Sequence, residues 1–362
     1  MTDIKIKSNK NEIFKTYLKK IGSGEVTGKS LTREESADAL DLMLNGCATE
    51  AQIGGFLIAQ RIRRPTPEEL AGMLDTYHNL GPTLISKENK KPPICIGMPF
   101  DGRNRTAPIY PLTALVLLSE RQPVIMHGGK RMPTKYGVTI NELFYSIGLD
   151  IFGLSIQDLQ EFFNDNDLGI INQPDHFPLA DKLITFRDQI GKRPPIASLE
   201  LIWTPHRGRH KIISGFVHSP TVERGWKALH IHGEKNLVFI KGLEGSIDLP
   251  ISKKTSGSEI SNEKLTKLNI DSREFKIYGK DQPWINIKDW SLNAKKALNN
   301  DGPFLKSLIW NAGYYLWITE TYSSLNESIK AAEKSIASNK PKDYLNKLIE
   351  SRNNQNNRPR VI

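Results

Sequence analysis

The sequence predicts an α/β protein in which a small N-terminal helical domain is joined to a larger domain with a mostly parallel sheet. Three features support this prediction. The first 80 or so residues carry helix-start signals followed by apolar residues at helical spacing. Residues 84–93 are polar and basic and end in two prolines, as expected of a linker. Beyond them, short apolar strands alternate with helices, a pattern typical of a parallel sheet covered on both faces.

Three helix starts are visible in the N-terminal part. Thr32 and Glu35 predict a capping box, in which each side chain accepts a hydrogen bond from the other residue's backbone N–H. Thr49 is expected to cap the next helix, and Thr66 precedes a proline at the first helical position. In the second of these helices, the apolar residues predicted to share one face are Ile53, Phe56, Leu57 and Ile62.

The larger domain is predicted from apolar runs that end in glycine or lead into helical periodicity. Helices are expected over residues 112–119, 155–163, 295–318 and 326–338. Strands are expected over residues 94–97, 123–128, 211–217, 227–233, 236–242 and 273–279. His230 and His232 alternate in one of these strands, so both should face one side of it, as buried hydrogen-bonded residues rather than metal ligands.

Composition places the chain among globular proteins. Hydrophobic residues make up 38% and charged residues 25% of the 362 residues, which excludes a disordered chain. The apolar runs are too short to span a bilayer, and the start lacks the apolar stretch of a signal peptide. We therefore expect no membrane partner and a cytoplasmic location. With Cys47 and Cys95 alone, neither a disulfide framework nor a cysteine-rich metal site is available.

The net charge of +10 favours an anionic partner, although a solvated basic surface would give the same composition. The cluster of Arg61, Arg63 and Arg64 follows a predicted helix and suits either a solvated face or the helix C-terminus. The loop over residues 205–211 is denser in charge than a solvated turn needs, so its candidates for nucleic-acid contact are Arg207, Arg209 and Lys211. Residues 351–362 hold three arginines and no acid, which predicts a disordered basic tail.

Four stretches occur in the order known from one enzyme family. They are residues 18–74 with the turn ATEAQIG, residues 127–150 beginning HGGKR, residues 187–205 beginning RDQIGKRPP, and residues 308–340. Over residues 15–350 the chain therefore resembles the anthranilate phosphoribosyltransferase family, which is glycosyl transferase family 3. The resemblance implies a fold like that of nucleoside phosphorylases and phosphoribosyltransferases, with domains over residues 1–85 and 92–345. It also implies that a segment near residues 157–187 returns to the helical domain, and that the N-terminal helices form a homodimer.

The phosphate turn of the family is altered in this sequence. The family has a G-T-G-G-D-G turn that cradles the pyrophosphate of phosphoribosyl pyrophosphate (PRPP), and residues 97–102 here are GMPFDG. Successive amides close around phosphate oxygens most readily on a glycine backbone, and Pro99 has no N–H to donate. The family's N-x-S-T donors are replaced by residues 109–112, and its acidic pair for magnesium by Glu244 and Gly245. One carboxylate in place of two implies a weaker ion site. A plain strand-to-helix connection also fits the turn.

Basic side chains surround this altered turn. The candidate phosphate or polyanion contacts are Gly97, Asp101, Gly102, Arg103, Arg105, His127, Gly128, Lys130, Arg131 and Lys135. By resemblance, His176 and Arg187 match residues near the acceptor, and Arg193 matches a further arginine of the family. His127 and Arg187 also suit purely structural roles. The pattern resembles a divergent branch of the family whose dimers bind nucleic acid without the parent reaction.

Two functional hypotheses follow. In the first, the basic cleft and the dimer surface bind nucleic acid or another phosphorylated ligand. In the second, the protein is a phosphoribosyl or related glycosyl transferase. Asp101, Lys135, Glu244 and Mg²⁺ would then position the diphosphate, and Arg187 would hold an acidic acceptor. The lost glycines of the turn favour the first hypothesis.

Overall fold

The N-terminal helices begin where their capping residues predict. The computed structural model describes residues 2–24, 26–261 and 263–356, and its first helices are α1 (Thr2–Gly22), α2 (Arg33–Leu44), α3 (Glu50–Arg63) and α4 (Pro67–Leu80). Thr32, Thr49 and Thr66 each form a complete capping box, so these three starts are confirmed. The glutamate or glutamine at the third helical position returns the hydrogen bond in every case.

These helices pack closely at two crossings. Phe14 of α1 meets Phe56 of α3 with ring centroids 5.5 Å apart. The crossing of α2 and α4 is tight at Gly72, where an added Cβ would lie 2.1 Å from the Arg33 carbonyl oxygen. Ile62 is 77% exposed, so the prediction that it shares the buried face of Ile53 and Phe56 is wrong. It lies in the last turn of α3 and is not among the buried residues of that helix.

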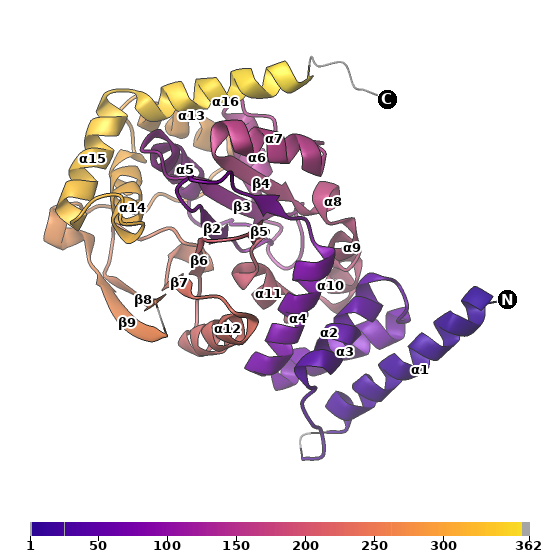
Figure 1. The fold of residues 1–362 in the computed structure, drawn as a ribbon. Helices are drawn as coiled ribbons and strands as arrows, with labels where there is room; N and C mark the ends of the chain where they lie inside the picture. Colours follow the sequence, from indigo (N-terminus) through magenta and orange to yellow (C-terminus); the bar gives the residue numbers. More distant parts are fainter. Residues whose placement is uncertain (1, 25, 262, 357–362) are drawn as a thin grey trace.

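A seven-stranded sheet forms the centre of the larger domain (Figure 1). The strand order is β4-β3-β2-β6-β7-β8-β9, in which the first five strands are parallel and the last two form an antiparallel hairpin. The bounds are β2 (Ile94–Gly97), β3 (Val124–Gly128), β4 (Leu168–Asn172), β6 (Lys211–Gly215), β7 (Asn236–Ile240), β8 (Thr255–Ser261) and β9 (Lys264–Ile270). Every residue of β2, β3 and β4 is buried, as expected for parallel strands covered on both faces.

Two predicted strands are wrong. Residues 227–233 belong to α12 (Ser219–His232), so His230 and His232 do not lie on one strand face. Residues 273–279 contain only the 3₁₀ turn η2 (Ser272–Phe275). The sheet instead takes β4 and the β8–β9 hairpin, which sequence analysis missed. The hairpin is largely polar and partly exposed, and so lacks the apolar run that marks the inner strands.

Helices cover both faces of the sheet (Figure 1). They are α5 (Tyr110–Ser119), α6 (Ile140–Ser146), α7 (Ile156–Asn166), α8 (Gln173–His176), α9 (Pro178–Asp181), α10 (Ile184–Ile190), α11 (Ile196–Ile202), α13 (Ile287–Leu298), α14 (Leu305–Ile318), α15 (Leu325–Ala337) and α16 (Lys340–Asn356), with the 3₁₀ turn η1 (Leu243–Gly245). The predicted helix over residues 295–318 is two helices, α13 and α14. Within the described part of the chain, no helix is long and apolar enough to cross a membrane.

The end of the chain differs from the predicted tail. Residues 351–356 are the last turns of α16, so the prediction of disorder is wrong for them. Arg352 is buried, and its Nε donates a hydrogen bond of 2.7 Å to the Asp150 carbonyl oxygen. The rest of the predicted tail, residues 357–362, lies outside the described residues.

Two short strands join the domains. β1 (Leu84–Ile85) follows α4 and pairs in parallel with β5 (His206–Arg207), which follows α11. Between these strands the chain returns to the helical domain, because α10 contacts α3 and α11 contacts α4. The predicted returning segment begins with α7, which packs instead on β4 and α16.

The close crossing at Gly72 gives a stability prediction. Gly72→Ala should lower the free energy of unfolding by about 2 kcal/mol or more, because the new methyl group overlaps the backbone of α2. Gly54→Ala in α3 is the matched control, since nothing lies within 4 Å of its added Cβ. It should be stabilising by roughly 0.5–1 kcal/mol. Chemical denaturation measures both, and equal effects would contradict the close packing of α2 on α4.

Candidate functional site

The altered turn after β2 is closed on itself. The Gly102 amide donates to the Pro99 carbonyl oxygen at 2.9 Å, and Gly102 has a φ of 72°, which suits glycine. Gly137 and Val138 donate their amides to the carbonyl oxygens of Asp101 and Arg103, each at 2.9 Å. The turn is therefore bound to the loop that precedes α6, and the Gly102 amide is not free for a ligand.

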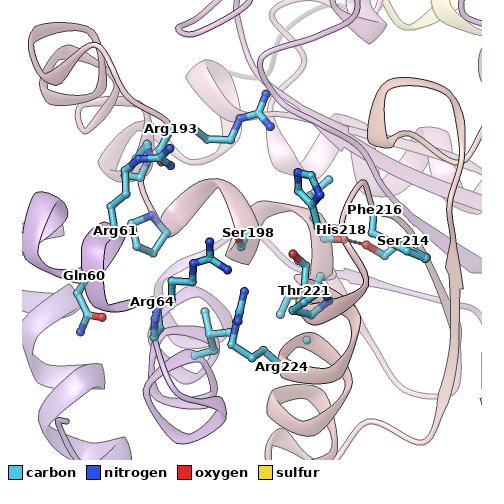
Figure 2. Close-up of a pocket in the computed structure, with 18 of the residues that line it drawn as sticks. Gln60, Arg61, Arg64, Arg193, Ser198, Ser214, Phe216, His218, Thr221 and Arg224 are labelled. Carbon is cyan, nitrogen blue, oxygen red and sulfur yellow. Dashed lines mark hydrogen bonds between the residues drawn. The ribbon is translucent and has the colours of Figure 1, made fainter.

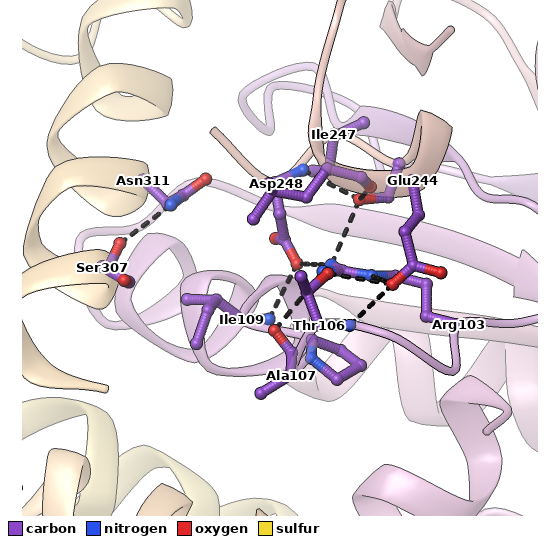
Figure 3. Close-up of polar contacts among 12 residues, drawn as sticks. Arg103, Thr106, Ala107, Ile109, Glu244, Ile247, Asp248, Ser307 and Asn311 are labelled. Carbon is purple, nitrogen blue, oxygen red and sulfur yellow. Dashed lines mark hydrogen bonds and ion pairs between the residues drawn. The ribbon is translucent and has the colours of Figure 1, made fainter. Parts of the chain in front are cut away.

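The amides beyond the turn hold the carboxylate of Glu244 (Figure 3). Thr106 donates its amide at 2.8 Å and its hydroxyl at 2.9 Å to Glu244 Oε1, and the Arg105 amide donates to the same oxygen at 3.1 Å. The guanidinium of Arg103 and the ammonium of Lys135 lie 3.6 and 3.7 Å from this carboxylate. Successive backbone amides with nearby cations form the kind of nest that binds anions, and here the chain supplies the anion itself.

The charge of Glu244 is strongly stabilised. Burial raises the pKa of this carboxyl, but the Thr106 amide and the charges of Arg103 and Lys135 outweigh burial and bring the pKa to about 2. Burial lowers the pKa of Lys135, whose Nζ also lies 3.3 Å from the Glu244 carbonyl oxygen. Glu244 is therefore ionised and occupied by donors at neutral pH.

Arg103, which the sequence suggested as a phosphate contact, is buried. Its side chain is 1% exposed and forms a buried ion pair with Asp248, which follows η1 (Figure 3). Asp248 also accepts the Ile109 amide at 2.8 Å, so the same carboxylate fixes the start of α5. An arginine enclosed with a carboxylate is a structural ion pair. Arg105 is different, because its side chain is 76% exposed.

Apolar side chains fill the space beside the turn. Phe100, Met132 and Ile184 form a small buried cluster that is separate from the main core. The His127 ring is fully buried, with its centroid 5.1 Å from that of Phe100 and 5.3 Å from that of Trp203. Burial lowers the pKa of His127 to about 3, so the imidazole is neutral. Gly128 packs against Ile140, whose Cγ2 would lie 2.9 Å from an added Cβ, and Gly97 against the Leu201 carbonyl oxygen.

The other predicted cations and the predicted acceptor residues mostly have partners. Lys130 pairs with Asp181 at 2.7 Å, and Arg131 with Glu142 at 2.8 Å. Arg187 pairs with Glu200 at 2.9 Å, with both side chains 3% exposed. His176 accepts the Asn172 amide at Nδ1, and its Nε2 lies 2.9 Å from the Leu154 carbonyl oxygen. Arg193 forms an ion pair with Asp101 of the turn.

The basic loop over residues 205–211 is also largely engaged. Arg207 donates to the His78 carbonyl oxygen at 2.6 Å. Lys211 pairs with Glu259 at 2.9 Å and donates to the Ile318 carbonyl oxygen at 2.8 Å. Arg209 is the exposed cation of the three candidates. The loop therefore offers fewer free charges than its composition suggests.

A cleft of about 860 Å³ lies between the helical domain and the sheet. A basic cleft was predicted from the sequence, but the cations that line this one are not the predicted phosphate contacts. We call it the arginine cleft, after Arg61, Arg64, Arg193 and Arg224, which line it together with Lys192 (Figure 2). Its lining residues include no aspartate or glutamate. Its floor contains Ser214 and Gly215 at the carboxyl end of β6 and the start of α12.

The strand order marks the edge of the sheet at which this cleft lies. From β2 the chain continues through β3 and β4 on one side, whereas β6 and β7 lie on the other side. Ligands of open α/β sheets bind at the carboxyl ends of the strands where the order reverses, here β2 and β6. The sequence signal was the cluster of Arg61, Arg63 and Arg64, interpreted as surface or helix-terminal charge. Arg224, far away in sequence, gave no signal.

Comparison with known proteins places these features in a family. Residues 15–81 match the helical bundle domain of the glycosyl transferase family, and residues 102–341 match its α/β domain. The anthranilate phosphoribosyltransferase of Lacticaseibacillus paracasei is 26% identical over 331 residues, covering 90% of this chain and 94% of that protein. An uncharacterised protein of Aquifex aeolicus is 25% identical over 332 residues, which cover 89% of this chain and 99% of that protein.

Solved structures show the same fold. The anthranilate phosphoribosyltransferase of Thermus thermophilus has a TM-score of 0.78 at 18% identity, covering 94% of this chain and 99% of that one. The anthranilate phosphoribosyltransferase of Saccharomyces cerevisiae in complex with PRPP and Mg has a TM-score of 0.80 at 17% identity. The match covers 94% of this chain and 98% of that one. The predicted fold class is thereby confirmed, with its helical bundle and its mostly parallel sheet.

The residues at the turn do not suit a magnesium ion. Mg²⁺ prefers carboxylate oxygens together with water and substrate phosphates. Here the carboxylate of Glu244 is occupied by amides and cations, and that of Asp101 by Arg193. Gly245 offers no carboxylate. In the described part of the turn, no acidic side chain is left free to bind the ion.

The lowered pKa of Glu244 gives a pH-dependence prediction. A folded pKa of about 2 lies below the unfolded value of about 4.3, so the stabilisation is present above that value and is lost as the pH falls towards 2. Glu244→Gln should therefore lower the free energy of unfolding by about 2 kcal/mol at neutral pH, a difference that should shrink below pH ~4. Denaturation across pH measures it, with the exposed Glu350→Gln as control. A loss that stays constant with pH would contradict the electrostatic account.

Proposed function

The chain belongs to the glycosyl transferase family, and we propose that it binds a phosphorylated ligand in the arginine cleft instead of carrying out the phosphoribosyl transfer of its named relatives. The proposal separates two parts of the molecule. The turn that resemblance assigns to PRPP is occupied by the chain's own groups. The neighbouring cleft is lined by several cations and by no aspartate or glutamate, and of its arginines Arg193 pairs with Asp101 of the turn.

The observation that carries the proposal is that Arg64 and Arg224 line one cleft whose lining residues include no aspartate or glutamate (Figure 2). Burial is the larger cause that lowers the pKa of Arg224, and the positive charge of Arg64 is the second cause. No ion pair joins either guanidinium to a carboxylate among the described residues. Two guanidinium groups that line one partly buried cleft repel each other, and an anion bound between them would remove that cost. A phosphate group matches the fork of donors that each arginine presents.

The backbone supports the same conclusion. Helix α12 begins at the cleft, and no side chain caps its first turn. The positive end of its dipole therefore lies at the cleft that Arg64 and Arg224 line, where His218, Pro220 and Thr221 are also lining residues. Arg64 itself has a φ of 64°, which costs a residue other than glycine roughly 1–3 kcal/mol. Backbone strain of this kind is typical of residues at ligand-binding sites, and here it supports a binding role for the Arg64 side chain.

Nucleic acid and a small phosphorylated molecule share the chemistry that this cleft recognises. A nucleic acid would engage several phosphates at once and would show a steep dependence on salt. A small ligand would occupy the start of α12 and show a shallow one. The homodimer implied by the resemblance remains part of the proposal. Light scattering that gives the mass of one chain would contradict it.

The cleft gives a binding prediction. Arg224→Ala and Arg64→Gly should each weaken binding of PRPP, of pyrophosphate or of a labelled single-stranded oligonucleotide by roughly tenfold, because each removes a charge-assisted contact. Arg64→Gly should leave the protein equally or more stable, since glycine relieves the positive φ. Fluorescence anisotropy and calorimetry at several salt concentrations measure affinity and its salt slope.

The control variant is Arg209→Ala, which removes an exposed charge outside the cleft and should bind as the wild type does. Wild-type affinity in both cleft variants would contradict the proposal. So would rapid release of pyrophosphate from PRPP on addition of anthranilate and Mg²⁺, which would favour the transferase hypothesis. Loss of oligonucleotide binding in Arg209→Ala alone would assign the contact to the loop over residues 205–211.

A further inference from the structure

Three potential metal ligands meet near the amino ends of β2 and β6. Cys95 lies in β2, His206 in β5, and His210 directly before β6. Each offers one ligand atom, and these atoms all lie within 4.8 Å of one another. Cys95 and His206 are 1% and 2% exposed, and the thiol forms no disulfide. Both histidines belong to the loop over residues 205–211, which was predicted to bind a polyanion, and the fold places them beside Cys95.

The two imidazole rings have the spacing and the relative orientation expected of two ligands of one metal ion. Their Nδ1 atoms lie 3.3 Å apart. Two nitrogens bound at about 2.0–2.1 Å to one tetrahedral Zn²⁺ are separated by about 3.4 Å, so the observed spacing fits. The ring planes are nearly perpendicular, at 88°, which keeps the two rings clear of each other.

The Nε2 atom of each ring lies close to an oxygen atom that can accept a hydrogen bond from it. His206 Nε2 lies 2.9 Å from Ser86 Oγ, and His210 Nε2 lies 2.9 Å from Glu234 Oε2. Histidine ligands of metals usually donate their second N–H to a carboxylate, a carbonyl or a hydroxyl in this way. Ser86 follows β1, and Glu234 follows α12, so four separate segments meet at the cluster.

Without an ion, a neutral His210 ring has one N–H for the two oxygen acceptors that it faces. His210 Nδ1 lies 2.9 Å from the Gly208 carbonyl oxygen, while its Nε2 faces the Glu234 carboxylate, so both nitrogens of one ring face acceptors. The Thr204 hydroxyl beside Cys95 is buried and has no conventional hydrogen-bonding partner among the described residues. An ion would engage both Nδ1 atoms and leave each Nε2–H to donate to its oxygen.

We propose that Cys95, His206 and His210 bind one divalent ion of the zinc class, with the Thr204 hydroxyl or a water molecule as the fourth ligand. A thiolate with two imidazoles is the donor set that Zn²⁺ prefers, and binding releases the proton of the Cys95 thiol. The ion would be structural, because the cluster is closed and lies apart from the arginine cleft. It would fasten β5, one of the two strands that join the domains, to the sheet.

Metal content of the full-length protein tests this site. After equilibration with zinc and removal of the excess, elemental analysis should find about one zinc per chain in the wild type and much less in Cys95→Ala. The matched control is Cys47→Ala, which removes the other buried cysteine and should leave the zinc content unchanged. Equal zinc in the two variants, or a wild type without zinc, would overturn the proposal.

A second measurement does not depend on a folded variant. Cobalt added to the wild-type protein should give a thiolate-to-cobalt charge-transfer band, and the melting temperature should rise with zinc and fall again with a chelator. A cobalt spectrum with no thiolate band would rule out Cys95 as a ligand. An unchanged melting temperature would contradict the structural role.

Discussion

The rest of the site depends on the hydrogen bonds that the backbone amides of Arg105 and Thr106 donate to the Glu244 carboxylate. It fixes the chain between the turn after β2 and the start of α5, and it brings the segment of η1 against that loop. Arg103 then lies between Glu244 and Asp248 and completes a buried network of two carboxylates and one guanidinium. Such a network is costly to break, because each member would be left as an uncompensated buried charge. A phosphate could reach these amides only by displacing a carboxylate whose pKa is about 2.

This network divides the basic residues of the molecule into two groups. Those around the turn are paired within the chain, as Lys130 is with Asp181 and Arg193 with Asp101. Those in the arginine cleft, above all Arg64 and Arg224, converge without a carboxylate among the residues that line it. The fold of the family is retained, and the free positive charge lies beside the position that resemblance assigns to PRPP. Arg193 touches both regions, since it lines the cleft and pairs with the turn.

Local features of the fold were predictable from sequence, and pairings between distant residues were not. Thr32, Thr49 and Thr66 set helix starts through contacts only three residues away, so the sequence contains the whole signal. Residues 227–233 were predicted as a strand because polar and apolar residues alternate there, yet tertiary packing makes them the end of α12. The candidate site shows the same limit. Charge counts predicted a basic region. They did not predict that Arg103 would be buried with Asp248, or that Arg64 and Arg224 would line the same cleft.

A crystal structure of the protein soaked with PRPP and Mg²⁺ tests the central claim most directly. Our account predicts phosphate density in the arginine cleft near Arg64, Arg224 and the start of α12. The Glu244 carboxylate should remain on the amides of Arg105 and Thr106, with no ion beside it. Diphosphate density on those amides, with the Glu244 side chain turned away to bind magnesium, would contradict the account and restore the transferase hypothesis.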